Sequence, residues 1–156
     1  MNDEHPDAPR VAMPPPLIHL GAIALGYGLD RFFGWRFPVG PELAMLAVVL
    51  LMPGILLVLW TILVLRQHQT TVLPHRAASS LVTRGPFRLS RNPIYLGFVL
   101  LHLACGLSLG SPGILLMLFP VFYVMNAHVI AEEEAFHHRK FGEQWEAYSR
   151  SVRRWV

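Results

Sequence analysis

A run of residues without a charged side chain, 43–65, limits what this chain can fold into. Its 23 residues are long enough for a membrane helix, because roughly 20 apolar helical residues cross the hydrocarbon core of a bilayer. Charged residues make up only 15% of the 156-residue chain and hydrophobic residues 53%, whereas soluble domains carry about 25% charged residues. The sequence therefore predicts an all-α integral membrane protein.

Three further apolar stretches, 17–33, 94–109 and 113–130, predict additional membrane helices. The last two are separated only by Gly110-Ser111-Pro112-Gly113, which contains helix-breaking residues and no charge, so we expect a tight hairpin there. The expected fold has about four transmembrane helices and a cytoplasmic amphipathic helix at the C-terminus, over 132–155.

The basic residues predict the orientation of these helices. With four spans, the N-terminal tail, the loop 66–93 and the C-terminal segment lie on one side and carry all but two of the 13 Lys and Arg residues. The exceptions are Arg31 and Arg36. By the positive-inside rule, we expect a multi-pass protein of the inner or plasma membrane with both termini in the cytoplasm. Residues 1–16, which are acidic and proline-rich, are expected to form a flexible tail, and residues 17–156 a single membrane domain.

The end of the 66–93 loop has the features of an anion site. Asn92 followed by Pro93 is a strong helix-start signal, with Asn92 as N-cap and Pro93 in the first helical position. The free N–H groups of a helix start attract anions, and Arg88 and Arg91 lie beside it. The arrangement predicts either a site for a carboxylate or phosphate, or arginines that anchor the loop to anionic headgroups.

Three adjacent carboxylates, Glu132 to Glu134, come directly after the last apolar stretch. They form either the solvated start of a helix or a site for a cation. Glu133 and Glu134 each have a histidine four residues later, but a metal site needs further ligands, and none is evident, so we expect no metal. His102, His128 and Cys105 lie in apolar stretches and are expected to be structural.

The segment 91–97, with the sequence RNPIYLG, resembles the Arg-His-Pro-x-Tyr-x-Gly motif of the isoprenylcysteine carboxyl methyltransferase family, which also includes phospholipid-methylating enzymes. Segments 81–83 and 85–87 are similar to the residues that precede that motif. The paired acids, spaced aromatic residues and Val-x-Arg ending of the family resemble the segment 133–155. The resemblance covers about residues 66–155, and it departs from the family at Asn92, where the usual residue is histidine.

The resemblance implies S-adenosylmethionine-dependent methyl transfer to a lipophilic acceptor, either an isoprenylcysteine-like carboxylate or another lipid-soluble amine, thiol or acid. The cofactor-binding part would be about 66–156. Arg91 and the helix start would take the cofactor's carboxylate, and Glu133 or Glu134 would balance its cationic part. The catalytic residues would be Glu133 and Arg153, with Arg154 an alternative to the latter. The expected cofactor-binding residues are Leu81, Val82, Gly85, Phe87, Arg88, Arg91, Asn92, Pro93, Tyr95, Gly97, Glu133 and Glu134.

Two other functions remain open on the sequence alone. One is an NADPH-dependent reductase of the sterol-reductase type, although Ile94 stands where those enzymes usually have Asn. The other is a non-catalytic lipid-binding membrane protein. A soluble nucleotide-binding methyltransferase is excluded, because no strands alternate with helices and no Gly-rich loop comes after a strand. The expected partners are membrane lipids and a lipophilic substrate, and not nucleic acid.

Overall fold

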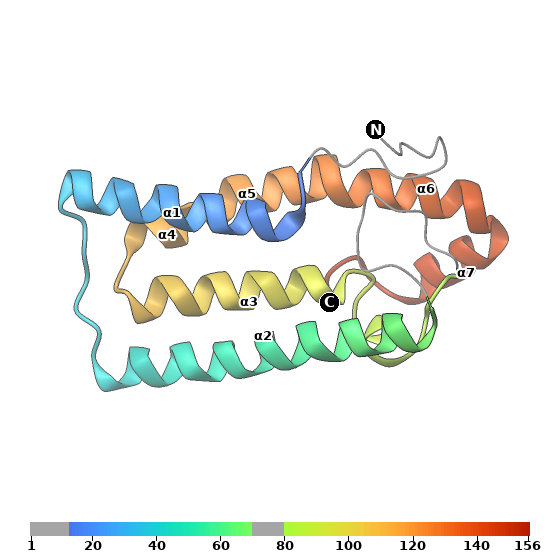
Figure 1. The fold of residues 1–156 in the computed structure, drawn as a ribbon, viewed down its shortest axis with the longest axis horizontal. Helices are drawn as coiled ribbons and strands as arrows, with labels where there is room; N and C mark the ends of the chain where they lie inside the picture. Colours follow the sequence, from blue (N-terminus) through green and yellow to red (C-terminus); the bar gives the residue numbers. More distant parts are fainter. Residues whose placement is uncertain (1–12, 70–79) are drawn as a thin grey trace.

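The computed structural model describes residues 13–69 and 80–156, and these are helical with short connections. Most helices run along the longest axis of the molecule (Figure 1). The part of the chain that it describes contains, in order, α1 (Pro15–Phe33), α2 (Pro41–Gln67), the 3-10 turn η1 (Gly85–Arg88), α3 (Pro93–Ser108), α4 (Pro112–Leu116), α5 (Leu118–Val124), the π-helical turn η2 (Met125–Ile130), α6 (Ala131–Phe141) and α7 (Glu143–Ser151).

Helix α3 lies in the middle of the molecule, between α2 on one side and α1 with α4 on the other (Figure 1). Two glycines bring α2 and α3 together. A Cβ atom on Gly97 would lie 2.6 Å from Val58 Cγ2 and 3.1 Å from the Gly54 carbonyl oxygen, and one on Gly54 would lie 3.0 Å from Leu101. Small residues at such a crossing allow close backbone approach, as is common between membrane helices.

Helix α1 is joined to the α3–α4 turn by one buried carboxylate. Asp30 accepts a hydrogen bond from the Ser111 hydroxyl and another, at 2.7 Å, from the Gly113 backbone N–H. Ser111 Oγ in turn accepts from the N–H of Ile114 and so caps α4. Gly110, with a φ of +57°, allows the sharp turn, and the hairpin predicted at 110–113 is confirmed.

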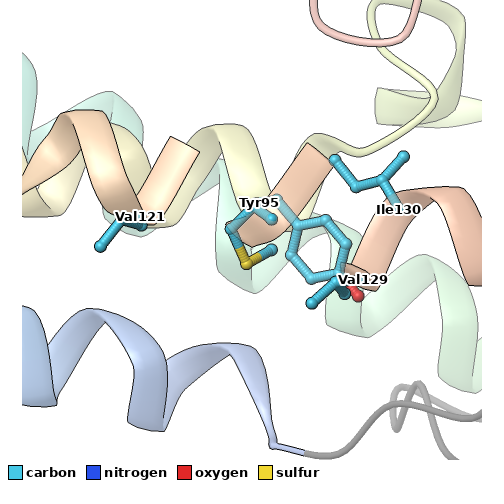
Figure 2. Packing of buried hydrophobic residues seen from close by; sticks show 5 residues of the cluster. Tyr95, Val121, Val129 and Ile130 are labelled. Carbon is cyan, nitrogen blue, oxygen red and sulfur yellow. The ribbon is translucent and has the colours of Figure 1, made fainter. Parts of the chain in front are cut away.

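Helices α4, α5, η2 and α6 form one helical run, Pro112–Phe141, of 30 residues. Tyr95 of α3 packs beside Val129, with Val121 and Ile130 on either side of it along the run, and Met125 completes the cluster (Figure 2). A π-helical turn adds a residue to one turn of a helix and therefore shifts the register of the helical residues after it. Here it precedes the acidic first turn of α6.

The described residues contain two helices long and apolar enough to cross a bilayer, α2 and the run Pro112–Phe141, fewer than the four expected. Helix α3 has only 16 residues, or about 24 Å, less than a hydrocarbon core of about 30 Å. Helix α1 has 19 residues, but they include His19, Asp30 and Arg31. The outer faces carry many exposed large apolar side chains, among them Leu56, Leu63, Phe119 and Tyr123, and the apolar window of α2 is only 17% buried. Large exposed apolar surfaces of this kind favour contact with lipid.

The C-terminal part differs from the single amphipathic helix expected over 132–155. The helical run ends at Phe141, because Gly142 has a φ of +50°, and α7 then turns back toward η1. The positive φ suits a residue without a Cβ atom. From Val152 the backbone is no longer helical, and the last five residues lie across the start of α3.

Two expectations fall partly outside the described residues. Of the residues 1–16 expected to form a flexible tail, 1–12 lie outside the described residues. The expected tail is too long at its other end, because α1 begins at Pro15. In the loop expected over 66–93, residues 70–79 lie outside the described residues, and Gly85–Arg88 form η1.

Candidate functional site

The residues expected to carry chemistry gather at one end of the molecule, where the end of α2, η1, the start of α3, α6 and α7 meet (Figure 1). The opposite end holds the connection from α1 to α2 and the turn before α4. Arg31 and Arg36, the two basic residues assigned to the other side of the membrane, belong to that opposite end.

A cluster of three charged side chains joins α6 to the start of α3 and to the C-terminal segment. The Arg91 guanidinium lies 3.2 Å from the Glu134 carboxylate. Arg154 contacts the same carboxylate through two nitrogens, with Nε at 3.1 Å. Arg91 also lies over the ring of Trp145 in α7, 5.6 Å from its centroid. The side chains of Arg91 and Glu134 are 15% and 19% exposed, so this is a partly desolvated ion cluster.

A second polar pair lies beside this cluster. The Tyr95 hydroxyl of α3 donates a hydrogen bond to Glu133 Oε1 of α6. The Tyr95 ring is buried in the apolar cluster of Figure 2. Among the described residues, Glu133 has no ion-pair partner, although Glu134 next to it has two. The pair thus places a carboxylate without a cation at the boundary of an apolar region.

The start of α3 is confirmed at Pro93, but the Asn92 side chain does not cap the helix. Asn92 Nδ2 instead donates to the backbone carbonyl of Arg154 at 3.0 Å, and the Ser90 hydroxyl donates to the same carbonyl at 3.1 Å. The N–H of Arg91 donates to the carbonyl of Arg153 at 2.9 Å. Asn92, which stands where the family that the sequence resembles has histidine, therefore holds the C-terminal segment against the loop.

The segment that precedes α3 is fixed by α7 and α2. The Tyr148 hydroxyl donates to the carbonyl of Phe87 at 2.8 Å. Burial raises the pKa of Tyr148 above its ordinary value, and the nearby Arg91 offsets part of that rise, so the hydroxyl remains a neutral donor. Gly85 has a φ of +61° and packs against Trp60 and Val64 of α2.

An open hollow of about 520 Å³ lies between this segment and α7. Arg88 is the charged residue of its lining, and Thr83, Gln144 and Ser151 provide neutral polar groups. Leu81 and Val152, with Ala147 and Tyr148, supply the apolar part. Of the expected cofactor-binding residues, Leu81 and Arg88 face this hollow, whereas Arg91 belongs to the ion cluster.

Four other residues expected to bind the cofactor or to act in catalysis lie in different surroundings from Leu81, Arg88 and Arg91. Val82 and Pro93 are buried. Gly97 faces α2, where it allows close packing. Arg153 is exposed, and its guanidinium lies 3.5 Å from the Val156 carbonyl. The cluster contains its neighbour Arg154 instead.

The histidines and the cysteine lie mostly away from this cluster. His102 pairs with His19 of α1 across a 3.1 Å nitrogen–nitrogen contact, as expected for a structural histidine, and also contacts the Ile114 carbonyl. His128 is exposed beside Tyr123. His138 contacts Glu146 of α7, and Cys105 is half-buried.

A family model described as "Phospholipid methyltransferase" matches residues 43–144, which include most of α2, all of α3 and the carboxylates of α6. The chain belongs to the phospholipid methyltransferase family. The resemblance drawn from the sequence is thus confirmed, and membership in this family implies methyl transfer to lipophilic substrates. An uncharacterized protein of Haemophilus influenzae is 36% identical over 63 residues, which are 40% of this chain and the whole of that protein. No solved structure matches the chain.

Several residues in and around the Arg91–Glu134 ion cluster could not be assigned from the sequence alone. Arg154 was considered only as an alternative to Arg153, because spacing alone does not show which of two adjacent arginines faces inward. Ser90 gave no signal at all. Trp145 belonged to the amphipathic pattern expected over 132–155, but its contact with Arg91 depends on the return of α7 after Gly142.

Proposed function

We propose that this protein transfers a methyl group from S-adenosylmethionine to a lipophilic acceptor at the cytoplasmic face of the membrane. The observation that carries the proposal is the meeting of Arg91, from the start of α3, with Glu134 and Glu133 of α6, inside the region that the family model matches. The contacts bring the start of α3 and the start of α6 together, although they are far apart in the chain.

The charges of this site suit the amino-acid part of S-adenosylmethionine. One carboxylate, that of Glu134, faces two guanidinium groups, which leaves an excess of positive charge. The Nε atom of Arg91 is buried and has no hydrogen-bond partner among the described residues, and a buried donor without a partner is costly. A carboxylate of the cofactor would satisfy it. Glu133, whose partner among the described residues is the Tyr95 hydroxyl, would face the cationic part.

The cofactor supplies, when bound, a methyl group on a positively charged sulfur. The protein's own contribution is positioning, because an in-line displacement depends on alignment of the reacting atoms. Arg91 orients the carboxylate end, and the Trp145 ring shields that guanidinium from water. If the acceptor is an amine or a thiol, Glu133 receives the proton that it loses, held in place by the Tyr95 hydroxyl. If the acceptor is a carboxylate, no base is needed.

The position of the site supports a lipid-soluble acceptor. Tyr95 belongs to the apolar cluster between α3 and the run Pro112–Phe141, and the outer face of that run exposes Phe119 and Phe122. An acceptor with an acyl or prenyl chain would reach the site from the bilayer. We further propose that α1 and α3 complete a four-helix membrane domain with the site end in the cytoplasm, where the basic residues gather. Membership in the methyltransferase family favours this function over a reductase.

The test is transfer of a tritiated methyl group from S-adenosylmethionine into lipid, with the purified protein in nanodiscs and phosphatidylethanolamine or S-farnesylcysteine as acceptor probe. We expect label that is extracted into organic solvent and increases with time. Arg91→Ala should abolish it, whereas Arg150→Ala, on the exposed face of α7, should retain it. Binding of the cofactor without any transfer to lipid would contradict catalysis, and absence of binding would contradict the whole proposal.

A further inference from the structure

The last residues of the chain, Val152–Val156, here called the C-terminal strap, have contacts that the proposed methyl transfer does not use. Chain ends usually fray unless they are tied down. The strap is tied by three hydrogen bonds to two successive carbonyls, those of Arg153 and Arg154, from donors on Ser90, Arg91 and Asn92. A fixed backbone here gives the neighbouring side chains of the strap defined positions.

Arg154 and Trp155 of the strap point to different places. Arg154 contacts Glu134 in the ion cluster. The Trp155 indole N–H donates to Asn126 Oδ1 of η2 at 3.0 Å, and its ring stacks on Phe122 of α5 with centroids 4.9 Å apart. Two adjacent residues therefore connect the charged site to the surface of the run Pro112–Phe141.

Trp155 lies between the site and the exposed face of α5. On one side it packs against the apolar cluster that contains Tyr95, the partner of Glu133. On the other side it contacts Phe122, which is 48% exposed. A lipid chain that lies along the exposed face of α5 and brings its head to Tyr95 would pass this indole.

Asn126 supports the same route for a lipid. It is an amide within the apolar part of the run, and polar groups in such segments are costly unless they have partners. Its Nδ2 donates to the Phe122 carbonyl and its Oδ1 accepts from Trp155. An amide has two donors and two acceptor positions, so each atom retains capacity for the polar head of a lipid.

We propose that Trp155 is a specificity-determining residue, the lipid-facing wall of the acceptor site, and that Ser90 and Asn92 are positioning residues that hold it there. This inference rests on the proposed methyl transfer. An indole covers about 150–250 Å², so its removal widens the approach to Tyr95 and Glu133 and weakens the distinction between acceptors of different bulk. The cofactor's contacts with Arg91 are not part of this wall.

The experiment uses the full chain in nanodiscs with two nitroxide-labelled probes, a phosphatidylethanolamine and an S-farnesylcysteine. Electron paramagnetic resonance measures the fraction of each probe that the protein immobilises, which gives the affinity of that probe. Quenching of Trp155 is read from the difference in fluorescence between the wild type and Trp155→Phe. We expect both probes to quench Trp155, and Trp155→Ala to change the ratio of the two affinities at least tenfold. Asn92→Ala should change the ratio in the same direction, whereas the control Trp35→Ala, at the opposite end, should not.

Two results would overturn the inference: absence of quenching at Trp155, or an unchanged affinity ratio in Trp155→Ala. Cofactor binding by the same samples separates this failure from that of the proposed function. A wild type that binds S-adenosylmethionine while Trp155→Ala keeps the original ratio refutes only the role of Trp155. A wild type that binds no cofactor refutes the methyl transfer and the acceptor wall together.

Discussion

Replacement of Arg91 by alanine should weaken the binding of S-adenosylmethionine about 10- to 100-fold. Arg91 carries the buried Nε atom without a partner among the described residues, and it shares Glu134 with Arg154. Hydrogen bonds to charged groups contribute about 1.5–3 kcal/mol, and about 1.4 kcal/mol is a tenfold change in affinity. Loss of one such interaction with the cofactor's carboxylate gives the expected range.

The same substitution should leave the protein folded. Glu134 keeps Arg154 as its partner, so no half-buried carboxylate is left without a cation. The remaining loss is the contact with Trp145. Cation–π contacts contribute about 0.5–1 kcal/mol at exposed sites and about 2 kcal/mol where the charge is desolvated, and the Arg91 side chain is only 15% exposed. The midpoint of thermal unfolding should therefore fall by about 4–8 °C at most, because about 1 kcal/mol shifts it by about 2–4 °C in a chain of this size.

The assay is calorimetric titration of the protein in nanodiscs with S-adenosylmethionine. Arg91→Lys keeps the charge but lacks the planar fork and the Nε donor, so its affinity should be intermediate. Arg150→Ala removes an exposed arginine of α7 and serves as the matched control. Equal affinities in the wild type and Arg91→Ala, with both proteins folded, would refute the assignment of Arg91 to the cofactor.

Three further substitutions test other parts of the structure. Glu133→Gln removes the carboxyl group that faces the cofactor's cationic part and should weaken binding about tenfold in the same titration. An unchanged affinity would exclude that role. Gly97→Ala places a methyl group against α2 and should lower the free energy of unfolding by about 1–3 kcal/mol. Gly21→Ala, which has no atom of the described residues within 4 Å of the added carbon, should not lower it. Asp30→Ala leaves the Ser111 hydroxyl and a backbone N–H without their acceptor and should destabilise by about 1–3 kcal/mol; an unchanged midpoint of unfolding would show that the link between α1 and the hairpin contributes little.

The sequence predicted the elements whose ends are marked by charged residues, by helix-breaking residues or by an Asn-Pro pair. The absence of charge over 43–65 located α2, the Gly110–Gly113 breakers located the hairpin, and Asn-Pro located the start of α3. It did not predict the turn at Gly142, because a single glycine among charged and aromatic residues is compatible with a continuous amphipathic helix. Of the four expected spans, two meet the length and composition of a membrane helix among the described residues, whereas α3 is short and α1 contains buried polar groups that face other helices.

The sequence predicted those residues of the site that belong to local motifs. Local signals and the resemblance together named Arg91, Tyr95, Glu133 and Glu134, and the structure brings all four together. Which of two adjacent residues faces inward depends on tertiary contacts, so Arg153 was preferred over Arg154. The role of Asn92 was also hidden, because its side chain bonds a carbonyl 62 residues away rather than the helix that it precedes.

The most direct test of the account is a density map of the protein with S-adenosylmethionine bound in a lipid environment. The account predicts the cofactor's carboxylate within hydrogen-bonding distance of Arg91 Nε and its sulfonium on the side of Glu133 and Tyr95. A cofactor bound elsewhere, for example in the hollow between Arg88 and Ser151 without contact to Arg91, would contradict it.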